Sequence, residues 1–411
     1  MPSSCATTPG PADLSVFDPK SLQTTAIIAG LVAIGPLATD MYLPAFPQLM
    51  REFGSSMDQV QQTLSVFLVG FALAQLVYGP LSDRYGRKPV LLGGLLLFLA
   101  SSIGAATADS MAGLTLLRLL QALGGSAGPV LGRAMIRDIH GPTESARLLS
   151  YIGTAMALAP AIAPILGGYM TSWLGWASIF LFLSAYAALG ILLLGTQVPE
   201  TMLIDGRHLA SMRRLLHNYG ELLRHRLWPW YTLTCSFVFA GLFSFLSGSP
   251  FVIIDYFGYR EESYGLFFAL IVFGFMAGTL IAGRLVRRMG IDRLIGTGAL
   301  LAAGGGGSMA LLALLRVDSV WAVILPHVIY MVGTGIVMPQ AMAGALAPFP
   351  EIAGTSSALL GFIQMTLAAA VGVLVGQYHD GTPLSMSLSI GLMGTLTLVS
   401  FAVLRYRRPA S

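Results

Sequence analysis

The chain has 411 residues, of which 55% are hydrophobic and only 10% are charged, and its mean hydropathy is +0.75. Since an ordinary soluble domain carries about 25% charged residues, this composition excludes a soluble globular protein and predicts an all-α polytopic membrane protein. The formal net charge is +4, and its two cysteines, Cys5 and Cys235, are too few for a disulfide framework or a cysteine metal site.

Residues 1–23 are polar, carry acidic residues at Asp13 and Asp18, and are followed by an apolar run without a small-residue cleavage site. This pattern predicts a cytoplasmic N-terminal tail and not a signal peptide. Twelve apolar runs of about 20 residues come after it, each long enough to cross a bilayer as a helix. They cover approximately residues 24–46, 61–81, 89–107, 111–135, 147–170, 176–196, 228–253, 263–286, 292–314, 320–344, 355–378 and 384–404.

The basic residues are distributed unevenly between the two alternating sets of loops. Of the 23 Lys and Arg residues, 19 lie in the set that includes both termini, three lie in the other set (Arg51, Arg260 and Arg316), and Arg118 lies inside a run. The positive-inside rule therefore predicts that both termini are cytoplasmic. This placement also explains the high pI of about 9.1 without a nucleic-acid partner.

The longest connection, residues 197–227, divides the runs into two sets of six, and its part from about 209 to 226 could form an amphipathic surface helix. Gly79, Arg84 and Gly86 recur at Gly283, Arg288 and Gly290 with one offset of 204 residues, which indicates an internal repeat. We therefore expect a six-helix bundle at 24–196, a cytoplasmic linker at 197–227, a second bundle at 228–405 and a cytoplasmic tail at 406–411. Such duplicated halves are typical of transporters that bind their substrate near the membrane midplane.

Asp40 is the only ionisable residue between Thr24 and Pro47. A carboxylate in a membrane span is costly and usually faces a partner or a cavity. Asp40 lies seven residues before Pro47, about 10 Å by helical rise, and Arg118 lies at a similar depth in the fourth run. We expect the two charges to pair. The alternatives are that Asp40 is an interfacial acid capping a helix, and that Arg118 extends outward or binds backbone carbonyls.

The loop between the second and third runs reads Gly79-Pro-Leu-Ser-Asp83-Arg84-Tyr-Gly86-Arg87-Lys88. Its glycines permit a tight turn, and its charges can form strong hydrogen bonds to neighbouring helix ends. The alternative is a positive-inside loop that only fixes topology.

This loop resembles the cytoplasmic signature of the major facilitator superfamily. Asp40 to Pro47, Arg137-Asp138-Ile139, Phe239 to Leu246 and Pro250-Phe251-Val252 are similar to the Bcr/CflA drug-resistance branch, and the resemblance extends from about Thr24 to Arg408. The resemblance implies the twelve-helix major facilitator fold and proton-coupled export of antibiotics such as bicyclomycin, chloramphenicol or florfenicol from the bacterial inner membrane.

Two further motifs are similar to signatures of this superfamily. Arg118-x-x-Gln121 resembles the fourth-helix signature of proton-coupled members, with Ala122 in place of a glycine. The segment with Pro160, Pro164, Gly167 and Gly168 resembles the antiporter motif of the fifth helix, although Ala159 and Ala163 stand where glycines are usual. Antiport is favoured over symport; the alternative is an ordinary kinked helix.

We interpret the chain as an alternating-access exporter that exchanges protons for a small, partly apolar drug. Asp40 would carry the proton and pair with Arg118 when ionised, while Gly79, Asp83, Arg84, Gly86 and Arg87 would form a gating loop. The residues expected to contact the drug, which could instead serve only in packing, are Tyr42, Gln121, Phe239, Phe243, Phe245, Tyr256 and Gln364.

The proton gradient would supply the energy, so we expect no cofactor, metal or nucleic acid, and we expect a monomer. One rival function is an exporter of a metabolite such as a dipeptide or cysteine. Another is a membrane enzyme or receptor on a transporter scaffold, which the lack of a nucleophile, base or metal cluster disfavours.

Overall fold

The computed structural model describes residues 22–201, 212–349 and 352–407, with side chains at all of these positions except 22, 140–158, 161, 212–216 and 353. Parts of the predicted N-terminal tail (1–21), linker (202–211) and C-terminal tail (408–411) lie outside the described residues. Every regular element in the described ranges is a helix, and these ranges contain no strand. The expected all-α class is therefore confirmed.

The first half contains nine helical elements. They are α1 (Leu22–Val32), α2 (Ile34–Asp40), the 3₁₀ turn η1 (Leu43–Ala45), α3 (Phe46–Phe53), α4 (Met57–Tyr85), α5 (Arg87–Ala106), α6 (Met111–Gly125), α7 (Ala127–Leu174) and α8 (Ala177–Gln197). The predicted first run is thus a broken helix, and α7 carries the end of the predicted fourth run together with the whole fifth.

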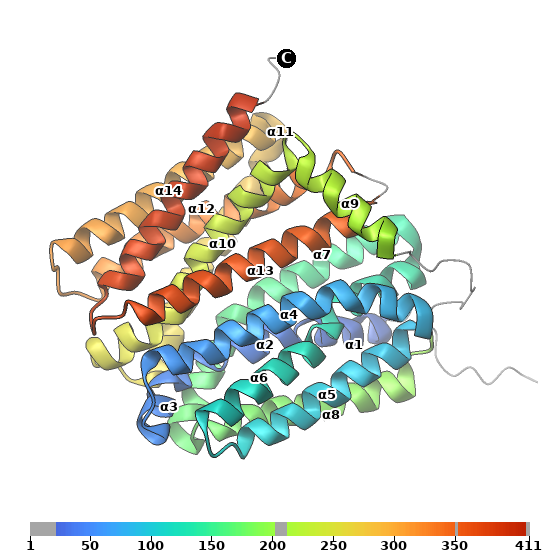
Figure 1. Ribbon diagram of the computed structural model, residues 1–411, viewed down its shortest axis with the longest axis horizontal. Helices are drawn as coiled ribbons and strands as arrows, with labels where there is room; N and C mark the ends of the chain where they lie inside the picture. The colour runs from blue at the N-terminus through green and yellow to red at the C-terminus, as the bar shows by residue number, and fades with distance from the viewer. Residues whose placement is uncertain (1–21, 202–211, 350–351, 408–411) are drawn as a thin grey trace, which may run out of the picture.

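The second half follows a short connecting helix, α9 (Met212–Arg224), at the position of the expected amphipathic helix. Its elements are α10 (Trp228–Pro250), the π-helical turn η2 (Phe251–Tyr256), α11 (Glu261–Leu314), α12 (Trp321–Leu346), α13 (Ala353–Gln377) and α14 (Leu384–Arg407). Figure 1 shows the two halves as separate layers of long helices, with α4 beside α13 where the layers meet.

Ten helical stretches of the described residues are long and apolar enough to cross a membrane. One of them, α11, has 54 residues and is broken at Gly290, whose φ of 75° and ψ of 165° are not helical. This glycine separates the predicted eighth and ninth runs. The predicted fifth run lies in the part of α7 where many side chains are not described. The observed helices therefore agree with the predicted twelve spans.

Two prolines explain why the first span is broken around Asp40. A proline ring has no N–H to donate and clashes with the carbonyl group four residues before it. Four residues before Pro36 is Val32, where α1 ends, and four residues before Pro44 is Asp40, where α2 ends. Asp40 is therefore the last residue of a seven-residue helix that lies between two breaks.

The backbone confirms the internal repeat. Six glycines of the described residues have a positive φ, and they form three corresponding pairs: Gly54 with Gly258, Gly86 with Gly290, and Gly175 with Gly381. The first two pairs are 204 residues apart, which is the offset read from the loop motif, and the third pair is 206 residues apart. Gly86 and Gly290 also share an extended ψ, of 154° and 165°, a conformation that is almost confined to glycine.

The two halves are joined by polar contacts at one end of the molecule, which we call the Arg51 end. Arg51 forms ion pairs with Asp255 (3.4 Å) and Glu261 (3.5 Å), and Ser172 donates to Glu262 at 2.6 Å. One turn into α4, Gln61 donates to the carbonyl oxygen of Ser247 at 2.6 Å. The opposite end, which carries Gly86 and Gly290, is called the Arg87 end; the charge distribution predicts that it faces the cytoplasm.

Candidate functional site

A cavity of about 380 Å³ lies between the two halves, within the range typical of small-molecule sites. Its walls come from α2, α4 and α7 of the first half and from α10, α11, α12 and α13 of the second. Six phenylalanines and three methionines dominate the lining, namely Phe67, Phe71, Phe239, Phe243, Phe268, Phe275, Met331, Met338 and Met365. Such a surface suits an apolar or aromatic molecule, because rings stack and methionine side chains adapt their shape.

Asp40 is the only ionisable side chain among the described residues that line this cavity, and Thr39 is the other polar one. The residue Asp40 is only 5% exposed. The Thr39 hydroxyl lies 3.0 Å from Asp40 Oδ1 and 3.1 Å from the carbonyl oxygen of Pro36. It can donate its single hydrogen to either acceptor. The carboxyl group therefore has a hydrogen-bond partner whether it is ionised or protonated.

The expected ion pair between Asp40 and Arg118 is not formed among the described residues. Arg118 is fully buried and donates through Nη1 to the carbonyl oxygen of Ala38, at 3.1 Å, and to Oε1 of Gln121. Its guanidinium carbon lies 4.5 Å from the ring centroid of Tyr42 and 4.3 Å from that of Phe67. The contact with Ala38 agrees with the predicted depth, since this residue is two positions from Asp40. Depth along a helix does not fix direction, however, and the Asp40 side chain faces the cavity while Arg118 binds the α2 backbone.

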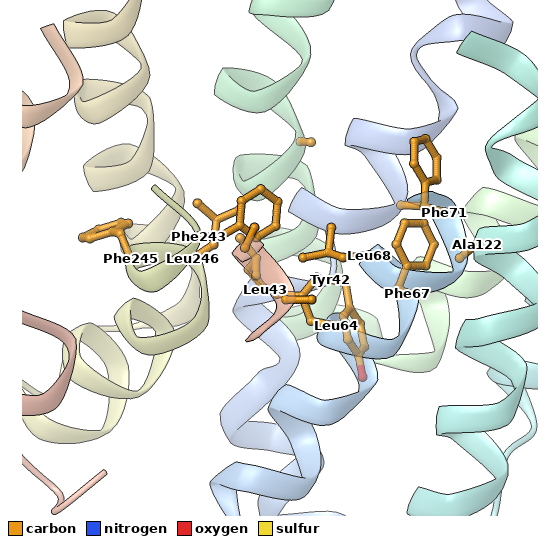
Figure 2. Close-up of a cluster of buried hydrophobic side chains, with 14 of the residues drawn as sticks. Tyr42, Leu43, Leu64, Phe67, Leu68, Phe71, Ala122, Phe243, Phe245 and Leu246 are labelled. Atoms are coloured by element: carbon orange, nitrogen blue, oxygen red, sulfur yellow. The ribbon is translucent and has the colours of Figure 1, made fainter. Parts of the chain in front are cut away.

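Two of the expected drug contacts, Tyr42 and Gln121, belong to this buried network and lie outside the cavity lining. The Tyr42 hydroxyl is 2.9 Å from Thr63 Oγ1, and Gln121 Nε2 donates to Ser102 Oγ at 2.7 Å. Both side chains are fully buried. In Figure 2 the ring of Tyr42 points away from Phe243 and Leu246 and lies between Leu64 and Phe67 of α4. The polar groups of Tyr42 and Gln121 have hydrogen-bond partners within the first half, so these residues pack behind the cavity wall and do not face the cavity.

Phe239 and Phe243 line the cavity as expected, with ring centroids 4.8 Å apart. Three other expected contacts do not line it. Phe245 stacks on His327 inside the second half, with ring centroids 4.1 Å apart. Tyr256 is 42% exposed at the Arg51 end. Gln364 is buried and precedes the lining residue Met365 in α13. Neighbouring residues on a helix point in different directions, so an aromatic residue in the right helix is not always on the right face.

Sequence reasoning missed the walls formed by α4 and α11. Phe67 and Phe71 are four residues apart, and Phe268, Ile271 and Phe275 follow helical spacing, so each set lies on one helix face. Apolar residues that face lipid repeat along a membrane helix with the same spacing as residues that face a cavity. The sequence therefore contained the pattern but gave no reason to assign it to a cavity.

The expected loop at Gly79–Lys88 is wrong, because α4 extends to Tyr85 and α5 begins at Arg87, so that only Gly86 lies between the two helices. The side chains of this segment bind to their own half. Arg87 forms ion pairs with Asp83 (2.6 Å) and with Asp138 of α7 (3.2 Å), and the Arg84 guanidinium lies over the ring of Tyr85. The Glu200 carboxylate accepts hydrogen bonds from the backbone N–H groups of Arg87 and Lys88, each at 3.1 Å. These contacts include the expected charge-assisted bonds to neighbouring helices.

Glycine has a different role at each of the two loop positions. At Gly86, φ is 95° and a side chain would meet the Glu200 carboxylate, whereas a side chain at Gly79 would meet open space. Only Gly86 is required by the local conformation.

The motif on α7 contacts both halves. Pro160 lines the cavity and Pro164 is buried. A side chain at Gly167 would press on the backbone of Met41, just after Asp40, and one at Gly168 would press on the backbone of Glu261 at the start of α11. Small residues allow helix backbones to approach closely in a membrane. The pair Gly167-Gly168 therefore lets α7 pack between the Asp40 segment and the second half.

Two duplicated helical halves that enclose a mostly apolar cavity define a membrane transporter. The described residues contain no group of three or more His, Cys, Asp or Glu side chains placed to hold a metal ion. The chain belongs to the Major Facilitator Superfamily, whose family model matches residues 28–373.

Similar proteins include several with drug-resistance names. The chain is 28% identical to a bicyclomycin resistance protein homolog of Haemophilus influenzae, covering 94% of this chain and 98% of that protein. It is 28% identical to multidrug resistance protein D of Escherichia coli, with coverage of 94% and 97%. It is 32% identical to a chloramphenicol resistance protein of Pseudomonas aeruginosa, with coverage of 86% and 83%. The resemblance to the Bcr/CflA drug-resistance branch is thereby confirmed.

Solved structures confirm the fold. A D-xylose-proton symporter superposes with a TM-score of 0.74, at 16% sequence identity, over 95% of this chain and 98% of that chain. At such low identity the similarity concerns the fold alone.

Proposed function

We propose that this protein is a drug:proton antiporter that exports small, partly apolar antibiotics by alternating access. The observation that carries this proposal is the single carboxyl group of Asp40 in a cavity otherwise walled by aromatic and aliphatic side chains. A lone titratable group at a binding site gives proton and drug one shared place at which they can compete.

The chemistry of the lining suggests the class of drug. Phenylalanine rings and methionines favour a flat or aromatic body, and Thr39 with Asp40 can bind one polar group of the ligand. Chloramphenicol-, florfenicol- and bicyclomycin-like compounds have this mixed character. The names of the drug-resistance relatives support the same class.

In the proposed cycle, Asp40 takes up a proton when the cavity faces the outer side and loses it when the cavity faces the cytoplasm. Protonation removes the only charge that the described residues bring to the cavity lining, and the Thr39 hydroxyl then turns from Asp40 towards the Pro36 carbonyl. Drug release and protonation would accompany each other because the neutral site no longer attracts the polar group of the drug.

Arg118 has a revised role in this proposal. Because it binds the carbonyl oxygen of Ala38 and lies under Tyr42 and Phe67, it would hold α2 so that Asp40 faces the cavity. It is therefore a positioning residue and not the partner of Asp40. Asp83 and Arg84 would influence opening at the Arg87 end.

We place the protein in the bacterial inner membrane as a monomer with both termini in the cytoplasm. The charge distribution supports this orientation. In the described structure the cross-half ion pairs lie at the Arg51 end, which supports a state closed on the outer side.

The test is transport in everted membrane vesicles energised by a proton gradient. Wild-type vesicles should accumulate chloramphenicol, and Asp40→Asn vesicles should not, although the variant inserts normally. Asp380→Asn provides a matched control, because Asp380 lies in the connection before α14 and binds Thr382. Equal accumulation by wild type and Asp40→Asn at equal expression would disprove the proton role. Competition by a lipophilic cation, compared with unlabelled chloramphenicol, would show which drug charge the site prefers.

A further inference from the structure

A large groove lies outside the transport cavity, at the Arg87 end of the second half. It has a volume of about 1540 Å³ and lies between the break in α11 at Gly290 and the last turns of α14. Figure 1 shows the end of α14 next to the bend of α11. Leu300, Leu398 and Phe401 contribute apolar walls, and Arg293 and Arg405 contribute two cationic side chains from the two helices.

The groove opens onto a face of the protein that lies against lipid tails. On α14, four large side chains are exposed at intervals of four and seven residues, which places them on one helix face: Leu388 (42%), Leu392 (56%), Val399 (51%) and Tyr406 (88%). Leu300 on α11 is 62% exposed. A mostly apolar face on a membrane helix faces acyl chains, and a tyrosine at its end marks the headgroup level. Arg405 precedes this tyrosine, so the arginines lie at the depth of the lipid phosphates.

The equivalent place in the first half is occupied by the protein itself. After Gly86, the Glu200 carboxylate binds the first turn of α5. In the second half, the residues from Leu384 to Ser411 include no Asp or Glu that could take the place of Glu200. They carry three arginines, Arg405, Arg407 and Arg408. Asp292 also lines the groove, where Tyr231 donates to its Oδ1 at 3.4 Å. The three charged groups of the lining therefore leave an excess positive charge beside an apolar wall.

The geometry points to a binding site for an anionic phospholipid of the leaflet at the Arg87 end. Arg293 and Arg405 bind the phosphodiester from two helices, since guanidinium groups match phosphate oxygens in shape and charge. Leu300 and Leu398 contact the first part of an acyl chain. Basic pockets between membrane helices on the cytoplasmic side bind headgroups in this way. Such a lipid would hold α14 against the break in α11, as Glu200 holds the first half.

The experiment is native mass spectrometry of the delipidated full chain titrated with phosphatidylglycerol, phosphatidylethanolamine or inorganic phosphate. Wild type should retain phosphatidylglycerol well above the other two. Each arginine near an anionic surface is worth about fivefold in affinity, so Arg293→Gln with Arg405→Gln should weaken retention roughly 25-fold. Arg407→Gln is the matched control, because its guanidinium lies 5.1 Å from the ring centroid of Trp230 and Arg407 does not line the groove.

A second variant keeps both charges and fills the groove. Ala402 is an exposed residue of the lining, and Ala402→Trp should exclude the acyl chain and lower phosphatidylglycerol retention at unchanged net charge. Equal retention by wild type and the double arginine variant would overturn the proposal, as would an equal loss in Arg407→Gln. Equal retention of phosphatidylethanolamine, or displacement of the lipid by inorganic phosphate at equal concentration, would show that the groove does not select an anionic phospholipid.

Discussion

Replacing Arg118 by methionine separates two models of the proton site. If Arg118 is the partner of Asp40, its removal leaves a buried carboxylate without a cation. If it positions α2, as the contacts with Ala38, Tyr42 and Phe67 indicate, its removal loosens a backbone segment and leaves Asp40 with the same Thr39 partner.

The contacts set the expected loss of stability. Hydrogen bonds from a charged donor to Ala38 and Gln121 are worth about 1.5–3 kcal/mol each, and the two nearest rings add about 1 kcal/mol each. Against this, Arg118 Nε and Nη2 are buried without hydrogen-bond partners among the described residues. Removing them recovers about 1–3 kcal/mol for each group. Taking the middle of each range, we expect a net loss of about 2–3 kcal/mol, at or below the 3–5 kcal/mol typical of breaking a buried ion pair.

The assay is a double-mutant cycle with Asp40→Asn, measured by reversible unfolding in mixed detergent micelles. If Arg118 contacts only the backbone of α2, removing either side chain leaves no unpaired partner charge, and the coupling energy should stay below about 1 kcal/mol. Arg133→Met serves as a control, because the Arg133 Nε donates to Pro129 within its own helix. A coupling energy above about 1 kcal/mol between Asp40 and Arg118 would refute the positioning model and restore the direct pair.

Three further predictions concern the ends of the molecule. Asp83→Asn removes one of the two carboxylate partners of Arg87. It should lower the turnover of bound drug in exchange assays more than it lowers drug affinity, and the reverse pattern would contradict a gating role. Exchanging the charges of Arg51 and Asp255 should restore only the first of the two ion pairs of Arg51, so it should slow transport less than Arg51→Asp alone, which adds like charges between the halves; vesicle efflux measures both. Gly86→Ala should destabilise by about 1–3 kcal/mol because its φ of 95° and ψ of 154° are almost confined to glycine, whereas Gly79→Ala should be neutral in the same unfolding assay.

The fold could be predicted because it depends on patterns of hydrophobicity, charge and glycine that are visible in the amino-acid sequence. Span length, loop charge and the repeat of Gly86 at Gly290 follow from hydrophobicity, the positive-inside rule and glycine conformation. The break at Asp40 was equally readable, since Pro36 and Pro44 each end a helix four residues before them.

The site was only partly predictable. Asp40 was found because a charge inside an apolar run is costly, and Phe239 and Phe243 lie where they were expected. The direction of Arg118 could not be read, because helical rise fixes the depth of a residue and tertiary packing fixes what it faces. The same limit explains why Phe245 lies on a histidine inside the second half and not in the cavity.

The contact between Arg51 and Asp255 has a consequence for the origin of the chain. These residues are 204 positions apart, so they occupy matching places in the two repeats, and they touch each other. Matching places can touch only close to the axis that relates the repeats. In an ancestor assembled from two identical copies, such a position would meet itself, and like charges there would repel. Opposite charges at a self-facing position require two repeats of different sequence, so this contact could form only after the repeats had diverged.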